Sequence, residues 1–384
     1  MIYFDYNATT PVHPFVKDTI CTYLGAEYGN PSSSHALGRG AKAAVDRARD
    51  LVAASIAAAN ASEIVFTGSA TESNNVALFG AAAEAPRTRR HLVVSAVEHP
   101  AVMEPALELQ RRGWRLSIAP VGRDGRLDLQ ALARILARGD VSLVSVMLAN
   151  NELGTIQPIS QISALTRESG VLLHVDAAQA MGKIDVNVDA LGVDLLTIAG
   201  HKMYAPKGIG ALYVRRGTRL RAPSFGASQE GGLRPGTENV AYIAGLGEAA
   251  RLVSVSEPKW RLMELFRNRL QFLLQKAIPG LVVNGSLDFR LPNTLHASLP
   301  SGSAATLVAM LGSQVALSTG AACHATGPVV LSGVLKAIGA SEQHARGALR
   351  ISLGWSTTPS EVDEGVELIV AAYASMHAPR LAAA

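Results

Sequence analysis

Lys202 lies in the segment of the chain most suggestive of chemistry, TIAGHKMYAPKGIGALYV (197–214). In this segment a lysine follows glycine and histidine at the end of an apolar, strand-like run, and a turn rich in proline and glycine leads into another such run. An amine at a strand end that lines a crevice is partly desolvated, which lowers its pKa and allows imine formation. A surface lysine in a turn would have the same local sequence, so the interpretation depends on the groups that accompany it.

Three other segments supply groups that an imine-forming cofactor needs. HVDAAQ (174–179) delivers Asp176 at the end of an apolar run, and a buried carboxylate requires a partner such as a protonated ring nitrogen. GSATESNN (68–75) begins a helix, and its hydroxyls and free N–H groups suit a phosphate, although an ordinary helix cap has the same composition. His99 could stack on an aromatic ring or satisfy a buried strand end. Together with the lysine, these groups describe a site for pyridoxal phosphate (PLP).

The elements that must position these residues are short apolar runs that alternate with helical patterns from about residue 40 to 215, such as a helix over 41–59. This alternation predicts a largely parallel sheet buried on both faces. Ligands bind beyond the carboxyl ends of such strands. The polar residues that close the runs are therefore expected to converge on one crevice: His99, Asn151, Asp176, His201 and Lys202.

The pattern changes after about residue 255. A long amphipathic helix over 260–278 is followed by shorter strand-like runs at 281–285, 294–300 and 348–354, with helices between them. This predicts a smaller α+β domain. We expect a large domain over residues 13–255 and a small domain formed by residues 1–12 and 256–384.

Composition narrows the class of protein. The 384 residues are 48% hydrophobic and carry a formal charge of +4 from scattered basic residues, which is typical of an α/β enzyme and argues against nucleic-acid binding. Neither a membrane-spanning run nor a signal-peptide pattern is present. The two cysteines, Cys21 and Cys323, cannot form a disulfide framework, so a cytoplasmic protein is expected. Cys323 lies among small residues in LSTGAACHATG (317–327), where a buried structural cysteine would be the ordinary interpretation.

The chain resembles the cysteine desulfurase and selenocysteine lyase family, class V of the PLP-dependent aminotransferase-fold enzymes. The resemblance covers nearly the whole chain, and the segments that carry it occur in order: YFDYNATTP (3–11), GNPSSSH (29–35), TGSATESNN, VEHPAV, ANNELGTIQP, HVDAAQ, GHKMYAPKGIGALYV, RPGTEN (234–239), GAACH and ALRISLG (348–354). It implies the α/β fold type I of PLP-dependent transferases, with a mostly parallel seven-stranded sheet in the large domain and a smaller α+β domain carrying the Cys323 loop.

Residue by residue, the resemblance implies a complete cofactor site. Lys202 would form the Schiff base, and Asp176 would bind the pyridine nitrogen. Gln179 would bind the phenolic oxygen, and His99 would stack on the ring and shuttle protons. Further contacts to the cofactor would come from several residues, the last of them reaching in from the neighbouring subunit of a homodimer: Ala70, Thr71, His201, Asn151 and Thr237.

The resemblance also implies the substrate site and the nucleophile. Asn151 and Arg350 would bind L-cysteine or L-selenocysteine, because a guanidinium matches an α-carboxylate through two parallel hydrogen bonds. Cys323 would take the sulfur or selenium and pass it to an acceptor protein. A free thiol has a pKa of about 8.5, and His324 is a candidate for assisting its ionisation.

Alternatives remain within this family. Ala199 stands where many desulfurases have a serine that contacts the phosphate, which predicts weaker PLP binding by about 1 kcal/mol. GAACH resembles the selenocysteine lyase branch, whereas the missing proline before the following helix does not. We expect a cysteine desulfurase, with a selenocysteine lyase as the first alternative and a class V aminotransferase or β-lyase that does not use Cys323 as the second. The presence of Lys202, Asp176 and Cys323 argues against a catalytically inactive scaffold.

Overall fold

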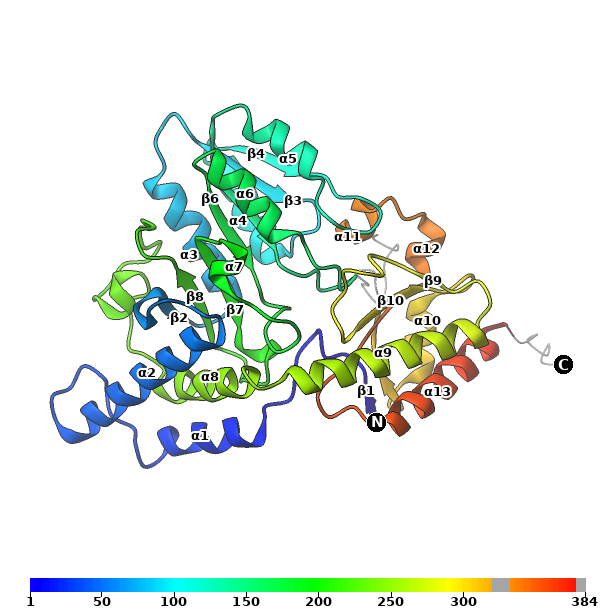
Figure 1. Ribbon diagram of the computed structural model, residues 1–384. Coiled ribbons are helices and arrows are strands. Elements are labelled where there is room, and N and C mark those ends of the chain that lie inside the picture. The colour runs from blue at the N-terminus through cyan, green and yellow to red at the C-terminus, as the bar shows by residue number, and fades with distance from the viewer. Residues whose placement is uncertain (320–331, 378–384) are drawn as a thin grey trace.

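The computed structural model describes residues 1–319 and 332–377, and its centre is a seven-stranded sheet with the strand order β2-β8-β7-β6-β5-β3-β4 (Figure 1). Strands β4, β3, β5, β6 and β7 run parallel, while β8 lies antiparallel between β7 and β2. The expected mostly parallel sheet of seven strands is therefore confirmed. The strands are β2 (Ile64–Thr67), β3 (His91–Ser95), β4 (Arg115–Ala119), β5 (Val141–Met147), β6 (Leu172–Asp176), β7 (Leu195–Ala199) and β8 (Gly210–Val214).

Both faces of this sheet are covered by helices because successive side chains of each strand point to opposite faces. On one face, Leu92 and Val94 of β3 pack with α3 (Ala70–Glu84) and α4 (Pro100–Arg111). On the other face, Val93 packs in a core that includes side chains of several helices: α1 (Pro14–Leu24), α2 (Ala36–Ser55), α5 (Leu129–Leu136), α6 (Ile159–Glu168), α7 (Val188–Leu191) and α8 (Val240–Val253). Burial on both faces explains why the inner strands are largely apolar, whereas the edge strand β4 keeps exposed residues.

Helix α2 begins and ends earlier than the 41–59 expected from its alanine-rich pattern. His35 caps its start, where the His35 Nδ1 accepts the N–H of Gly38 at 3.3 Å. After Ser55 the chain turns, and Ala57 has a φ of 53°, in the left-handed region that stops helix propagation.

The C-terminal part forms separate, smaller sheets. Strands β12 (Ser318–Thr319), β13 (Ala348–Ser352), β10 (Thr294–Ser298) and β9 (Val282–Val283) form one sheet in that order, and β1 (Ile2–Tyr3) pairs with β11 (Val315–Ala316). The helices are α9 (Glu257–Ala277), α10 (Ala304–Leu311), α11 (Gly333–Ala337), α12 (Glu342–Arg346) and α13 (Pro359–His377). Helix α9 follows α8 and runs beside α13 (Figure 1).

The hydrophobic core of this part joins the two ends of the chain. Ile2 and Phe4 are buried together with Leu270 of α9, Leu295 of β10 and Ile369 of α13. This distribution supports our proposal that residues 1–12 and 256–384 form one domain and residues 13–255 the other.

The N-terminal segment then crosses from the small sheets to the large one. Asp5 forms a parallel bridge with Ser352 at the end of β13. A few residues later, Thr10 N–H donates to the carbonyl oxygen of His201 at 2.9 Å. Residues 6–9 therefore pass between the two parts of the fold. Among the described helices, none is long and apolar enough to cross a membrane.

Candidate active site

A cavity of about 420 Å3 lies beyond the carboxyl ends of β3, β5, β6 and β7, bordered by the N-terminal segment and β13. Nine of the residues expected in the site line it: Ala70, Thr71, His99, Asn151, Asp176, Gln179, His201, Lys202 and Arg350. Thr237 is exposed and does not line the cavity of its own chain. Cys323 and His324 lie outside the described residues.

Lys202 lies in a short 3-10 turn, η2 (Gly200–Lys202), directly after β7. Its Nζ donates to the carbonyl oxygens of Asn7 at 2.5 Å and Ala8 at 2.6 Å. Burial and the nearby charge of Arg350 lower the pKa of Lys202 to about 8, although Asp5 and Asp176 oppose the shift. About a tenth of this amine is therefore uncharged and nucleophilic at pH 7, far more than of an ordinary lysine.

Asp176 ends β6 with a buried carboxylate. Its Oδ2 accepts from Asn74 Nδ2 at 2.8 Å and its Oδ1 from the N–H of Ala178 at 2.9 Å. Burial raises the pKa of Asp176, and these hydrogen bonds and the charges of His99 and Lys202 oppose the rise. A cationic N–H beside the carboxylate would favour its ionised form, and among the described residues the hydrogen bonds to this carboxylate come from an amide and a backbone N–H.

His99 is the N-cap of α4, and its Nδ1 accepts the N–H of Ala101 at 3.0 Å. Burial lowers the pKa of His99, so the ring is neutral and the proton resides on Nε2. The preceding residue, Glu98, fixes this turn because its buried Oε1 accepts from Ser95 Oγ and, at 2.9 Å, from the N–H of Met147. Burial raises the pKa of Glu98 to about 8.

The start of α3 forms an anion site at the edge of the cavity. Ser69 caps the helix through its Oγ, which accepts the N–H of Glu72 at 3.1 Å. The N–H groups of Ala70 and Thr71 make no hydrogen bond within the described part of the chain. Gly210 permits the close approach of β8, because a Cβ there would lie 2.8 Å from the carbonyl carbon of Ser69. Two free donors at the positive end of a helix dipole suit a phosphate.

His201 and Ala199 also line the cavity. Burial, together with the charges of Lys202 and Lys207, lowers the pKa of His201 to about 4, so its ring is neutral. Its Nδ1 lies 3.1 Å from Thr9 Oγ1. The methyl group of Ala199 offers no hydrogen-bond donor where a serine would.

Arg350, on β13, brings a guanidinium to the cavity from the small sheet. Its Nη2 donates to Asp5 Oδ1 at 2.8 Å and Ser318 Oγ at 3.1 Å, and its Nη1 donates to the carbonyl oxygen of Asn151 at 3.2 Å. The buried Nε has no partner within the described residues. Asn151 follows Asn150, whose Oδ1 accepts the N–H of Leu153 at 2.8 Å and so builds the turn that presents Asn151. A cation held in this way can bind a carboxylate.

Both described ends of the segment that carries Cys323 lie near this guanidinium. On one side, Ser318 pairs with Arg350 across β12 and β13. On the other side, Ser332 caps α11 and interacts with Glu152, the neighbour of Asn151. The residues on either side of the Cys323 segment, Ser318 and Ser332, therefore both lie at the end of the cavity that Arg350 lines.

These residues fit PLP. Within the part of the chain that the structure describes, the cavity contains an amine of lowered pKa, a buried carboxylate with no hydrogen bond from a cation, and a helix N-terminus with two free N–H donors. These are the groups that a carbonyl, a ring nitrogen and a phosphate require. Within the described residues, no group of three or more metal-binding side chains is present.

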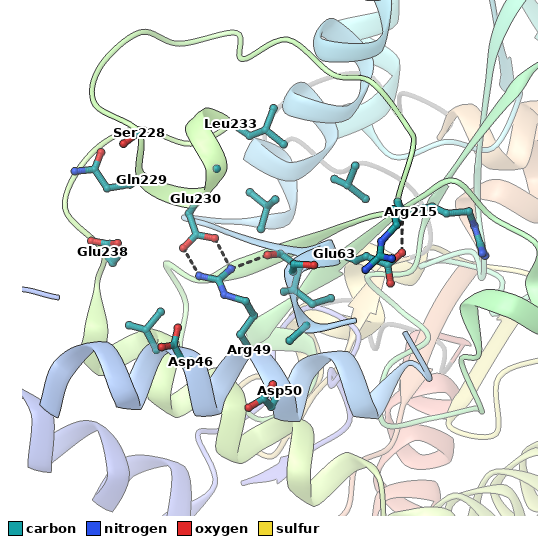
Figure 2. A pocket seen from close by; sticks show the side chains of 18 of the residues that line it. Asp46, Arg49, Asp50, Glu63, Arg215, Ser228, Gln229, Glu230, Leu233 and Glu238 are labelled. Atoms are coloured by element: carbon teal, nitrogen blue, oxygen red, sulfur yellow. Dashed lines mark hydrogen bonds and ion pairs between the residues drawn. The ribbon is translucent and has the colours of Figure 1, made fainter. Parts of the chain in front are cut away.

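A larger cavity, of about 850 Å3, lies between α2 and the segment of residues 228–238, which we call the arm (Figure 2). Figure 2 shows Arg49 of α2 pointing at Glu230 of the arm. The two Nη atoms of Arg49 donate to the two carboxylate oxygens of Glu230, both at 2.7 Å. Glu230 Oε2 also accepts the N–H of Phe66 at 2.7 Å, and Arg49 Nη1 donates to the carbonyl oxygen of Ile64 at 2.6 Å. These contacts satisfy the free edge of β2 and attach the arm to it.

A second ion pair attaches the arm to the start of α3. Arg234 Nε donates to Glu72 Oε1 at 3.2 Å, and Glu72 Oε2 accepts the N–H of Gly68. The arm is thus held at two points beside the anion site, and Thr237 follows as an exposed residue.

Reasoning from the sequence missed several residues that organise the cavity. Asn74 donates a hydrogen bond to the carboxylate of Asp176, and Asp5 accepts one from the guanidinium of Arg350. The backbone oxygen of Asn7 accepts a hydrogen bond from Lys202 Nζ. Asp5 and Asn7 belong to YFDYNATTP, a segment that carried the family resemblance but contains no strand-end signal. The only signal in the sequence that could have identified Asp5 and Asn7 is that they are polar residues in a segment without apolar periodicity.

Comparisons with known proteins agree with this geometry. Residues 2–364 match the family described as Aminotransferase class-V. The chain is 44% identical to the cysteine desulfurase IscS of Anaeromyxobacter sp. (strain K), over 96% of this chain and 91% of that protein. Among solved structures, a NifS-like protein is 35% identical with a TM-score of 0.90, covering 97% of this chain and 99% of its own. SspA, solved in complex with cysteine, is 34% identical with a TM-score of 0.81, covering 92% and 99%.

Proposed function

The chain belongs to the class V aminotransferase family, and we propose that it is a PLP-dependent cysteine desulfurase that forms L-alanine and leaves the sulfur of L-cysteine on Cys323. The observation that carries the proposal is the single cavity that joins Lys202, Asp176 and Arg350 beside both ends of the Cys323 segment. The relatives named cysteine desulfurases and the related structure that contains cysteine support the choice of substrate.

We propose the following cofactor contacts. Lys202 would form the covalent link, and Asp176 would hold the proton on the ring nitrogen. Gln179 would donate to the phenolic oxygen, and His99 would stack on the ring. The phosphate and the rest of the ring would be bound by Ala70, Thr71, His201 and Asn151. When bound, PLP supplies an electron sink for the charge that develops at the substrate α-carbon.

The side chains of the cavity also bind the substrate and transfer its protons. Arg350 binds the substrate carboxylate, and Asp5 fixes the direction of its guanidinium. Asn151 supports the same end of the substrate. Lys202 Nζ, whose lowered pKa makes its uncharged form accessible, accepts the α-proton. His99 Nε2–H lies on the cavity as a further proton donor.

Cys323 completes the reaction as the nucleophile. Its thiolate attacks the sulfur of the substrate, a sulfur–sulfur bond forms and the bond between Cβ and sulfur breaks. The electron pair of the broken bond ends as a C–H bond at Cβ after protonation, and Lys202 returns a proton to the α-carbon, which gives L-alanine. Cys323 keeps the second sulfur as a persulfide, and no external oxidant or reductant is needed.

The test uses the PLP-loaded protein with L-cysteine. We expect L-alanine to form, and peptide mass spectrometry to find one additional sulfur on the Cys323 peptide before a thiol is added. Pyruvate in place of alanine would indicate a β-lyase, and transfer of the amino group to an oxo acid would indicate an aminotransferase. Either result would contradict the proposal.

The rate at which the apo protein combines with PLP is expected to rise with pH around pH 8. Only the uncharged amine of Lys202 attacks the aldehyde, and its pKa is lowered to about 8 from the 10.5 of an ordinary lysine. Below this pKa the amine is protonated and slow, and above it the rate levels off. Stopped-flow absorbance measures the profile, and a rise that continues toward pH 10 would show that Lys202 is not desolvated. The phosphate does not interfere because its second pKa is about 6.

We also propose that the protein acts as a homodimer in which Thr237 contacts the PLP phosphate of the partner subunit. Thr237 is exposed and does not reach the cavity of its own chain. Its arm is nevertheless held rigidly by the Arg49–Glu230 and Glu72–Arg234 pairs. A fixed, exposed arm suits contact with a second copy.

We further propose that an acceptor protein takes the sulfur from Cys323. A cytoplasmic, reducing setting is part of the proposal, since Cys21 is an unpaired, exposed thiol.

Glu230→Ala is expected to lower the free energy of unfolding by about 3 kcal/mol, because it leaves the Arg49 guanidinium without its partner. PLP binding to the homodimer should weaken as well, since the arm that carries Thr237 loses one of its two attachments. Chemical denaturation and PLP titration measure the two effects. Asp46→Asn is the matched control because Asp46 lines the same cavity in an exposed pair with Lys42. It should change stability by less than about 0.5 kcal/mol. Unchanged PLP affinity in Glu230→Ala would contradict the role of the arm.

A further inference from the structure

Lys183 is a buried lysine that the proposed function does not use. It lies in the turns after β6, and only 4% of its surface is exposed. Burial lowers the pKa of Lys183 well below its ordinary value, and the charges of Lys202 and Arg350 lower it further. The hydrogen bonds that its Nζ makes within the described residues are to side-chain amides, and none is to a carboxylate. A buried amine needs partners of this kind, and their identity indicates its role.

The two partners of Lys183 are the carboxamides of Gln179 and Asn7. Lys183 Nζ donates to Gln179 Oε1 at 2.6 Å and to Asn7 Oδ1 at 3.2 Å. A carboxamide has an acceptor oxygen on one side and a donor NH2 on the other, and its two orientations are almost equal in shape. A donor placed at both oxygens selects one orientation. Each amide therefore turns its oxygen toward Lys183 and its nitrogen away.

The orientation selected by Lys183 reaches the active-site lysine. Gln179 Nε2 donates to the backbone oxygen of Asn7 at 3.0 Å, and the same oxygen accepts from Lys202 Nζ at 2.5 Å. Asn7 Nδ2 donates to Thr294 Oγ1 at 2.9 Å, on the small sheet. A continuous row of hydrogen bonds thus runs from Lys183 through Gln179 and Asn7 to Lys202.

We propose that Lys183 is a positioning residue that fixes the side-chain amide of Gln179 with its N–H donors on the cavity side. The side-chain oxygen of Asn7 accepts from Lys183 and also from Asn293 Nδ2 at 3.1 Å, so the backbone carbonyl oxygen of Asn7 stays beside the Lys202 amine. Without Lys183, the amide of Gln179 can turn over and present its oxygen to the cavity, where it would repel the phenolic oxygen of PLP. The inference rests on the cofactor contact proposed for Gln179.

The test is a double-mutant cycle of Lys183→Met and Gln179→Ala, read out as the equilibrium Kd of PLP for the apo protein. We expect Lys183→Met to weaken PLP binding about tenfold in the wild-type background. In the Gln179→Ala background the same change should alter the Kd by less than about twofold, because the residue through which Lys183 acts is gone. Equal weakening in both backgrounds, or none in the wild type, would overturn the proposal. If Gln179→Ala alone leaves the Kd unchanged, Gln179 does not contact PLP. The proposed role of Lys183, which depends on that contact, is then also excluded.

Arg267→Met is the matched control for loss of a buried cation. Arg267 is 3% exposed and donates to the carbonyl oxygen of Leu291 at 3.0 Å, in the small-domain region. This variant should lower the Tm without changing the PLP Kd, which separates general destabilisation from positioning.

Gln179→Glu keeps the proposal testable if Lys183→Met does not fold. A glutamate still offers Lys183 an acceptor oxygen but has no N–H to present to the cavity. We expect about tenfold weaker PLP binding with a Tm at or above that of the wild type. Wild-type PLP affinity in Gln179→Glu would overturn the proposal.

Discussion

Lys202→Ala is expected to reduce L-alanine formation from L-cysteine by a factor of about 10²–10⁴ or more, because it removes both the covalent link to PLP and the base that accepts the α-proton. The variant should bind PLP only reversibly, so that borohydride treatment leaves no cofactor attached to the chain. Alanine analysis and the visible absorption of the treated protein measure the two effects. Among the described residues that line the cavity no other lysine can replace Lys202, because the nearby Lys183 is held behind Gln179 and Asn7.

Lys207→Ala is the matched control for this experiment. Lys207 is an exposed lysine five positions further along the same turn, outside the lining of the cavity. Its replacement should leave the rate of alanine formation within about twofold of the wild type. Alanine formation by Lys202→Ala at a rate close to the wild type would exclude a covalent PLP mechanism.

Cys323→Ala is expected to abolish alanine formation from L-cysteine, by at least about 10³-fold, while PLP binding and its absorption spectrum stay unchanged. The reason is that the cofactor contacts come from the described cavity, whereas the nucleophile comes from the segment between Thr319 and Ser332. The activity of the PLP-loaded variant with L-cysteine and with L-selenocysteine gives two independent measurements. Loss of both activities supports the persulfide route.

The other outcomes identify the alternatives. If only the activity with L-cysteine is lost, the protein is a selenocysteine lyase in which Cys323 serves to discriminate between the substrates. Full turnover of L-cysteine would indicate a β-lyase or aminotransferase that does not use this thiol. Cys21→Ala is the control, because Cys21 is the other cysteine of the chain and lies exposed on α1. It should leave the activity unchanged.

The strand-end residues of the large domain could be placed from the sequence. His99, Asp176 and Lys202 each follow a short apolar run, and parallel strands bring their carboxyl ends to the same edge of a sheet. The structure has the sheet of seven strands and places these side chains around one cavity. Apolar periodicity carries this information because it is a local property of each strand.

The contacts of the N-terminal segment could not be predicted from local sequence patterns. Asp5 and Asn7 lie in a short polar segment without periodicity, yet they contact Arg350 and Lys202, more than 190 positions away. The pairing of Arg49 with Glu230 joins residues 181 positions apart. Such contacts depend on how the small sheets, the arm and the large sheet pack together.

The sequence by itself therefore determined the kinds of group in this site and the sheet edge where they gather. The tertiary structure decided their protonation and orientation. Burial lowers the pKa of Lys202 and raises that of Asp176, and a charge loses its hydration only when neighbouring elements close over it. The direction of the Gln179 amide likewise depends on the buried Lys183, whose importance shows only when the residues that surround it are known.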